Sequence, residues 1–245
     1  MKKLILPVLV MATFASYAQQ NNSTGNGLLK KATDIFNKSK GNGGLSNDDI
    51  VAGLKEALTV GAQNSSSKLS AVNGFFADAA IKVLLPPEAK NAESALRSIG
   101  LGNMVDDAVL SMNRAAEEAS KSATPIFVNA IKSMSIQDAV GILRGNDSAA
   151  TSYLKVKTTP DLVSAFRPVI DDALQKTNAT KYWKDVVDTY NNFPTTFHKI
   201  NSDLTGYVTD KALTGMFHEV SLEEQKIRKD PAARVTDILQ KVFAK

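Results

Sequence analysis

The sequence predicts an all-α protein, and two kinds of pattern lead to this prediction. From Ser46 onward, apolar residues recur three or four positions apart, which is the spacing that gathers them on one face of a helix. Helix start and stop signals separate these segments, and no segment alternates between apolar and polar residues for more than a few positions. We therefore expect a single-domain bundle of about nine or ten helices, without a sheet, over residues 46–245.

Capping residues, glycines and prolines mark where each helix should begin and end. Ser46 is a favourable N-cap, and Ser135 with Asp138 resembles a capping box. Pro125 predicts a break near residues 123–124, and Pro160 predicts a new start because proline suits the first position of a helix. After the first helix, the expected helices are about 88–98, 103–123, 126–134, 136–144, a short one from 147, 160–176, 180–191, 203–229 and 231–243.

The N-terminal residues 1–18 have the three parts of a secretory signal peptide. Lys2 and Lys3 give a positive start, residues 4–14 are uncharged, and Ser16 and Ala18 are the small residues that a signal peptidase requires. The apolar part is shorter than the ~20 residues of a membrane-spanning helix. We expect an exported protein, periplasmic or secreted, in which residues 19–45 form a flexible leader with one short helix.

Charge and cysteine content narrow the class of protein further. Without residues 1–18 the chain has 27 basic and 25 acidic residues, a net charge of +2. Such a weak charge predicts no nucleic-acid partner. The chain has no cysteine, so we expect folding without disulfides and no lipid anchor on a cysteine. No later segment has the length and apolar composition expected of a transmembrane segment.

The common motifs of catalytic and cofactor sites are missing from the sequence. His198 and His218 are far apart, and the His-Glu pair at position 218 lacks the second histidine of a zinc protease. There is no Gly-x-Ser-x-Gly motif and no phosphate-binding Walker motif, and the Gly-Leu-Gly at 100–102 lacks the third glycine of a dinucleotide-binding loop. We therefore expect neither a cofactor nor a metal.

Two acidic residues on the expected helix 203–229 are the first candidates for a functional site. Glu223 and Glu224 both fall within the apolar face of that helix. A buried carboxylate without a partner costs several kcal/mol, so each residue requires one. Arg228 lies one turn beyond Glu224 and is expected to pair with it.

Glu223 requires a partner from a different helix. The basic residues that could supply it are Arg114, Arg144 and Arg167. Such pairs either lock helices together or place a general acid or base in a cleft. We expect the structural role and keep the catalytic role as the alternative.

A second polar cluster, Asn113, Arg114 and Glu117, lies on the expected helix 103–123. Arg114 is opposite the apolar face of this helix, and Glu117 is expected to pair with Lys121 on the surface. A solvated helix face is the expectation. The alternative is a helix that is contacted on two sides, with Arg114 buried against a neighbour.

Several short segments, in order along the chain, carry a resemblance to a known family. These segments are residues 53–58 with Gly61, 112–117, 138–139 with 142–143 and Gly145, 149–151, 208–209, 211–213 with Gly215 and Phe217, 223–224 with 227–228, and 241–243. Together they resemble the uncharacterised bacterial domain-of-unknown-function family numbered 4197, whose members are exported. The resemblance extends from about Ser46 to the C-terminus; it implies export and a helical fold, and it implies no activity.

These observations lead to two hypotheses of different class. The first is a non-catalytic exported protein that binds an unknown small ligand or an envelope protein. The alternative is an envelope hydrolase that uses Glu223 and Glu224 as an acid pair. A polar cleft around these two residues would favour the hydrolase. A dry tunnel between helices would favour a carrier of a lipid or small molecule. A large exposed apolar patch would favour a structural subunit of a complex.

Overall fold

The protein is helical throughout the part of the chain that the structure, a computed structural model, describes: residues 46–100, 102–192, 199 and 201–230. These residues contain eight α-helices, one short 3-10 helix and no strand, so the prediction of a helical fold without a sheet is confirmed for them. The helices are α2 (Asn47–Ser70), η1 (Pro87–Ala89), α3 (Lys90–Ser98), α4 (Gly102–Ser120), α5 (Ala123–Lys132), α6 (Ile136–Arg144), α7 (Ala149–Lys176), α8 (Ala179–Asn191) and α9 (Leu204–Lys229).

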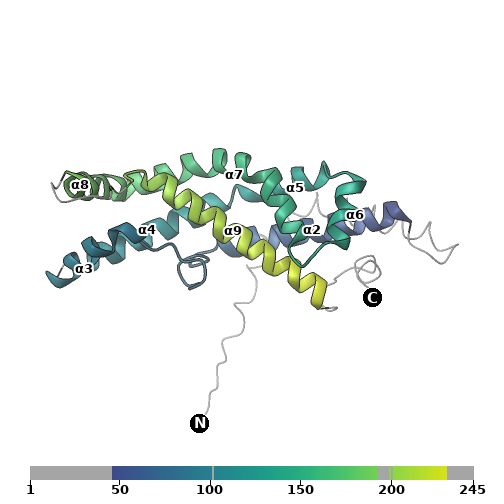
Figure 1. Cartoon of the computed structure of the whole chain (residues 1–245), viewed down its shortest axis with the longest axis horizontal. Helices are drawn as coiled ribbons and strands as arrows, with labels where there is room; N and C mark the ends of the chain where they lie inside the picture. Colours follow the sequence, from purple (N-terminus) through teal and green to yellow (C-terminus); the bar gives the residue numbers. More distant parts are fainter. Residues whose placement is uncertain (1–45, 101, 193–198, 200, 231–245) are drawn as a thin grey trace, which may run out of the picture.

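The long helices form an elongated molecule (Figure 1). Helices α2 and α4 follow one another along one side, α7 runs along the other side, and α9 crosses them. Helix α7 packs against both α4 and α9, and α9 also packs against α2. Helices α3 and α8 lie at one end and α6 at the other. An irregular segment, residues 71–86, joins α2 to η1.

The helix starts predicted at Ser46, Ser135 and Asp203 are confirmed by capping hydrogen bonds. Oγ of Ser46 accepts a hydrogen bond from the backbone N–H of Asp49, whose carboxylate accepts one from the backbone N–H of Ser46. Ser135 and Asp138 form the same reciprocal pair at the start of α6. Asp203 caps α9 by accepting from the backbone N–H of Gly206 at 2.8 Å. These caps satisfy backbone donors that the first turn of a helix leaves free.

The prediction of a helix start at Pro160 is wrong. Helix α7 is continuous from Ala149 to Lys176, and Pro160 and Pro168 both lie inside it. A proline inside a helix costs about 3 kcal/mol, but it interrupts only one backbone hydrogen bond. One side of α7 is buried along its whole length, and each large apolar side chain there contributes about 1.5–3 kcal/mol. The buried residues, four apart, are Leu154, Thr158, Leu162, Phe166, Ile170 and Leu174.

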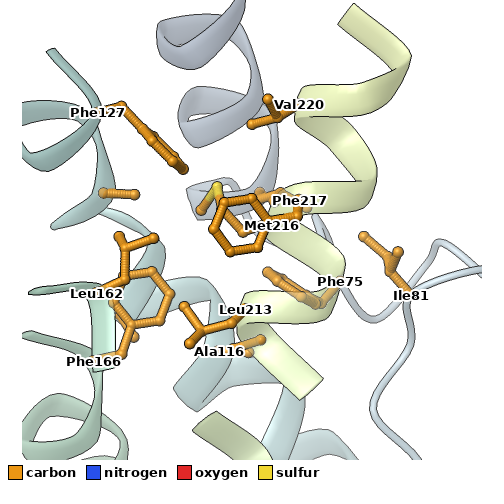
Figure 2. Packing of buried hydrophobic residues seen from close by; sticks show 14 of the residues in the cluster. Phe75, Ile81, Ala116, Phe127, Leu162, Phe166, Leu213, Met216, Phe217 and Val220 are labelled. Carbon is orange, nitrogen blue, oxygen red and sulfur yellow. The ribbon is translucent and has the colours of Figure 1, made fainter. Parts of the chain in front are cut away.

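One large cluster of buried apolar side chains joins α2 and α4 to α9, together with residues of the 71–86 segment, and Ala57 with Ile227 forms a small second cluster. Figure 2 shows its centre, where side chains of α9 meet those of α4, α5, α7 and the 71–86 segment. The rings of Phe127 and Phe217 pack edge to face, with centroids 6.0 Å apart and an angle of 77°. The large cluster therefore includes buried residues from α2 and from every helix from α4 to α9.

Some expectations lie outside the described residues. These are the signal peptide, the leader with its short helix, and the helix expected over 231–243. Nine or ten helices were expected, and the described part contains eight α-helices. The two helices expected from 147 and from 160 form the single helix α7. In the same part, no single helix is long and apolar enough to cross a membrane. The bent pair α5 and α6, at 105°, meets the criteria of length and composition only.

Candidate functional site

The candidate polar residues do not form one site, because they contact different parts of the fold. Asn113, Arg114 and Glu117 hold the 71–86 segment against α4. Glu224 and Arg228 bind the start of α7, and Glu223 contacts α2. Some of their partners lie within one helical turn, as Arg228 does for Glu224, and others lie far away in the sequence, as Asn64 does for Glu223.

Asn113 is completely buried, and its side-chain amide forms hydrogen bonds with both backbone groups of Val83. Its Oδ1 accepts from the backbone N–H of Val83 at 2.9 Å, and its Nδ2 donates to the carbonyl of the same residue at 2.8 Å. Nδ2 also donates to the carbonyl of Val109, one turn earlier in α4, at 2.7 Å. An amide supplies both a donor and an acceptor, so Asn113 satisfies both backbone groups of Val83 without a charge.

Glu117 was expected on the surface with Lys121, and this expectation is wrong. Only 4 % of Glu117 is exposed, and its Oε1 accepts from the backbone N–H groups of Phe75 and Phe76 at 3.2 and 3.3 Å. Its Oε2 lies 2.5 Å from Nη1 of Arg114. Lys121 pairs with a different acid, Glu118.

Arg114 completes this arrangement at the edge of the molecule. Its side chain is partly exposed, and its Nη2 donates to Oδ1 of Asn73 at 2.8 Å. Asn73 has a φ of +69°, a conformation that asparagine tolerates better than most residues. The alternative interpretation is therefore right for the helix, which is contacted on two sides, while Arg114 itself is not fully buried.

Glu224 pairs with Arg228 as expected, and both lie largely out of solvent. Nε and Nη2 of Arg228 donate to Oε1 of Glu224 at 3.0 and 2.9 Å, and Nη2 also donates to the carbonyl of Ile142. The carboxylate accepts further from the backbone N–H groups of Ala150 and Thr151 and from the hydroxyl of Thr151. Glu224 thus caps the positive end of α7 from a neighbouring helix.

The partner of Glu223 is not one of the three arginines that the sequence suggested. Its Oε2 accepts from Nδ2 of Asn64 on α2 at 2.9 Å, and Nζ of Lys226 lies 3.6 Å from its Oε1. The side chain is 20 % exposed, so it lies at the edge of the α2–α9 contact. A helical wheel places Glu223 toward another helix but does not identify that helix.

Another buried acid, Glu219, was not predicted from the sequence. Nζ of Lys68 lies 2.7 Å from its Oε1, and Asp78 lies 3.6 Å from the same Nζ. The hydrogen bond to Glu219 is the main reason that the pKa of Lys68 is raised. Glu219 lies four residues from both Gly215 and Glu223, so the three residues share one face of α9. This spacing was the signal in the sequence that Glu219 faces another element.

A cleft of about 390 Å³ lies elsewhere, between the middle of α7, the start of α9 and the residues around η1. Its charged lining consists of three acids and one arginine: Glu88, Asp203, Asp210 and Arg167. Pro86 and Tyr207 supply the apolar surface. The sequence marks Asp203 as a helix start, and positions 203, 207 and 210 share one face of a helix.

The floor of the cleft is fixed by an ion pair beside a glycine. Nη2 of Arg167 lies 2.7 Å from Oδ2 of Asp203, while Oδ1 of Asp203 caps α9. The hydrogen bond from Arg167, followed by that from the backbone of Gly206, holds the pKa of Asp203 below its usual value. A Cβ at Gly206 would lie 2.5 Å from Oδ2 of Asp203 and 3.1 Å from Nη1 of Arg167. Glycine at this position leaves room for the ion pair.

Tyr207 forms a wall of the cleft and is held in place by its hydroxyl group. The hydroxyl donates to the carbonyl of Leu84 at 3.1 Å. Burial, and then the negative charge of Glu88, raise the pKa of Tyr207 above its usual value.

Neither histidine belongs to a group of side chains that could bind a metal ion in the described part of the chain. His218 is exposed, and His198 lies outside the described residues. Among the residues that the structure describes, no group of three or more His, Cys, Asp or Glu side chains is arranged to hold a metal ion.

Comparison with known proteins identifies the family. The model of DUF4197, a family of proteins of unknown function, matches residues 44–244. The chain belongs to this family. The resemblance drawn from the short segments is confirmed, and its extent agrees with the expected start near Ser46. No curated protein and no solved structure matches the chain significantly.

Proposed function

We propose that this DUF4197 protein is an exported, non-catalytic binding protein that holds a small ligand in the cleft between α7, α9 and η1. The cleft is the observation that carries this proposal. Its volume, about 390 Å³, lies within the range of small-molecule sites, about 300–1,000 Å³. Polar groups from three separate elements converge on it, as they do in sites that orient a ligand.

The interactions of the other buried polar groups support a binding role over a hydrolytic one. The carboxylates of Glu117, Glu219 and Glu224 each accept hydrogen bonds from the protein itself. Glu223 and Glu224 contact different helices and do not line the cleft. The hydrolase hypothesis needed both acids in one cleft, so we do not carry it further.

Native mass spectrometry of protein purified from its own envelope tests the proposal. We expect a low-molecular-mass ligand on the parent protein and none on Asp210→Arg, which would fill and recharge the cleft from an exposed position. Glu118→Arg is the matched control, because Glu118 is equally an exposed acid but pairs with Lys121 outside the cleft. A ligand-free parent protein, or a ligand retained by Asp210→Arg, would contradict the proposal.

A further inference from the structure

The lining of the cleft has an excess of negative charge, because it contains three acids and one arginine and the arginine pairs with one of the acids. Asp203 and Arg167 neutralise each other across 2.7 Å. Glu88 and Asp210 remain, on η1 and α9, and within the described chain neither carboxylate takes part in a hydrogen bond or an ion pair. Beside the lining, Nζ of Lys211 lies 5.5 Å from the centre of the Tyr207 ring. The cleft therefore offers two free negative charges beside an aromatic ring that already attracts an ammonium group.

The spacing of the acids does not suit a bare metal ion. A metal requires several ligand atoms at about 2.0–2.6 Å from one point. No group of three acids or histidines in the described chain meets that requirement, although three acids line this one cleft. Glu88 and Asp210 come from different elements, η1 and α9, and an organic molecule with two donor groups can contact both.

Apolar groups line the cleft together with the charged groups. Pro86 and Tyr207 both belong to the lining, and the hydroxyl of Tyr207 is turned to the carbonyl of Leu84. Because Pro86 is largely buried, the ring of Tyr207 is the main surface for carbon atoms of a ligand. A molecule with a positive charge at each end and a short aliphatic chain between them could contact both carboxylates and the apolar lining of the cleft.

We infer that the ligand of the cleft is a small organic amine, whose ammonium groups bind Glu88 and Asp210 while its carbon chain lies along Tyr207 and Pro86. The inference rests on the proposed function, and it adds the chemical class of the ligand. Arg167 serves here as a positioning residue, since it holds Asp203 and keeps the floor of the cleft in shape.

Titration calorimetry with three five-carbon probes tests the class of ligand. The probes are 1,5-diaminopentane, 1,5-pentanediol and glutarate, which have the same length and differ in charge. We expect only the diamine to bind, with an affinity that falls as ionic strength rises. Binding of glutarate or the diol as tight as that of the diamine would overturn the inference.

Single variants then assign the contacts. Glu88→Gln and Asp210→Asn should each weaken diamine binding about threefold or more, and together about tenfold, as expected for partly exposed ion pairs. Glu118→Gln, outside the cleft, should leave it unchanged. Diamine binding that is unaffected by both cleft variants would also overturn the inference.

The two proposals fail in different ways. If glutarate or the diol binds, and Asp210→Arg changes that binding, the cleft is a ligand site but the amine class is wrong. If no probe binds and protein from the envelope carries no ligand, both the amine class and the proposed function are wrong.

Discussion

At the scale of single residues, Glu224 and Glu223 are neighbours with very different surroundings. Glu224 is buried and accepts hydrogen bonds from two backbone N–H groups, one hydroxyl and Arg228. Glu223 is at an edge and accepts one hydrogen bond from Asn64. We expect Glu224→Gln to lower the free energy of unfolding by about 1–3 kcal/mol, because an amide cannot accept with its nitrogen and leaves buried donors unsatisfied.

The control for this measurement is Glu223→Gln. Its amide oxygen can still accept from Asn64, so the loss should stay below about 1 kcal/mol, the usual value of an exposed contact. Urea unfolding of both variants beside the parent protein gives the comparison. Equal losses, or a more stable Glu224→Gln, would show that the carboxylate does not stabilise the start of α7.

Glu56 on α2 gives a prediction with a definite dependence on pH. Both of its carboxylate oxygens are shielded from solvent and have no hydrogen-bond partner among the residues that the structure describes, and burial raises the pKa of Glu56 above the usual 4.5. The folded protein therefore favours the neutral carboxyl group, and stability is lost as pH rises from 4.5 through the raised pKa.

Glu56→Gln imitates the neutral form at every pH. We expect it to raise the free energy of unfolding at pH 7 by about 0.5–1 kcal/mol, within the range of single stabilising substitutions. The gain should disappear below pH 4.5, where the parent side chain is protonated in both states. Unfolding curves at pH 7 and pH 4 measure the difference; a gain that is the same at both values would argue against burial of the charge as its cause.

What the sequence predicts about single residues depends on how local the partner is. The Glu224–Arg228 pair spans one helical turn, so it follows from helix geometry alone. The partners of Glu117 and Glu223 are about 40 and 159 residues away. A helical wheel shows that such residues face another element, but the identity of that element depends on tertiary packing.

At the scale of elements, the contact between α9 and the 71–86 segment depends on a glycine. A Cβ at Gly215 would lie 2.6 Å from Cε1 of Phe75 and 3.3 Å from Cβ of Ile81. Figure 2 shows both of these side chains beside α9. We expect Gly215→Ala to lower the free energy of unfolding by about 1–3 kcal/mol, because the ring of Phe75 is completely buried and has no free space to move into.

Gly141→Ala separates this packing effect from helix propensity. Gly141 lies inside α6, is exposed, and would place its Cβ in open space. We therefore expect the alanine to stabilise the protein by about 0.5–1 kcal/mol, through propensity alone. Thermal unfolding of the two variants should shift in opposite directions; a stabilised Gly215→Ala would mean that the 71–86 segment does not pack closely on α9.

Helix boundaries were predictable where a local signal also decides the structure. Ser46 and Ser135 each form a capping box with an acid three residues later, and both helices begin there. Pro160 was misleading because its local preference competes with the burial of six side chains along α7. The hydroxyls of Thr158 and Thr159 also donate to backbone carbonyls of the preceding turn, at 2.7 and 2.6 Å. Tertiary burial outweighs the preference of one residue.

At the scale of the whole molecule, the cleft combines segments that the sequence gives no reason to combine. Its lining comes from residues 86–88, 167 and 201–210, which the fold of α7 against α9 brings together. Each segment alone has an ordinary local explanation, such as a helix cap at Asp203. The helical class followed from periodicity along the chain, whereas the cleft depends on how the helices are arranged.

The last prediction concerns the export of the protein and the removal of residues 1–18. The two lysines, the uncharged residues 4–14 and the small residues Ser16 and Ala18 predict cleavage after Ala18. Intact-mass measurement of protein recovered from outside the cytoplasm should give a chain of 227 residues that begins at Gln19. Ala18→Arg provides the control, since a large charged residue at this position should block cleavage and leave the precursor. An extracytoplasmic protein with residues 1–18 still attached would contradict cleavage after Ala18, whereas protein found only in the cytoplasm would contradict the export on which the proposed binding role depends.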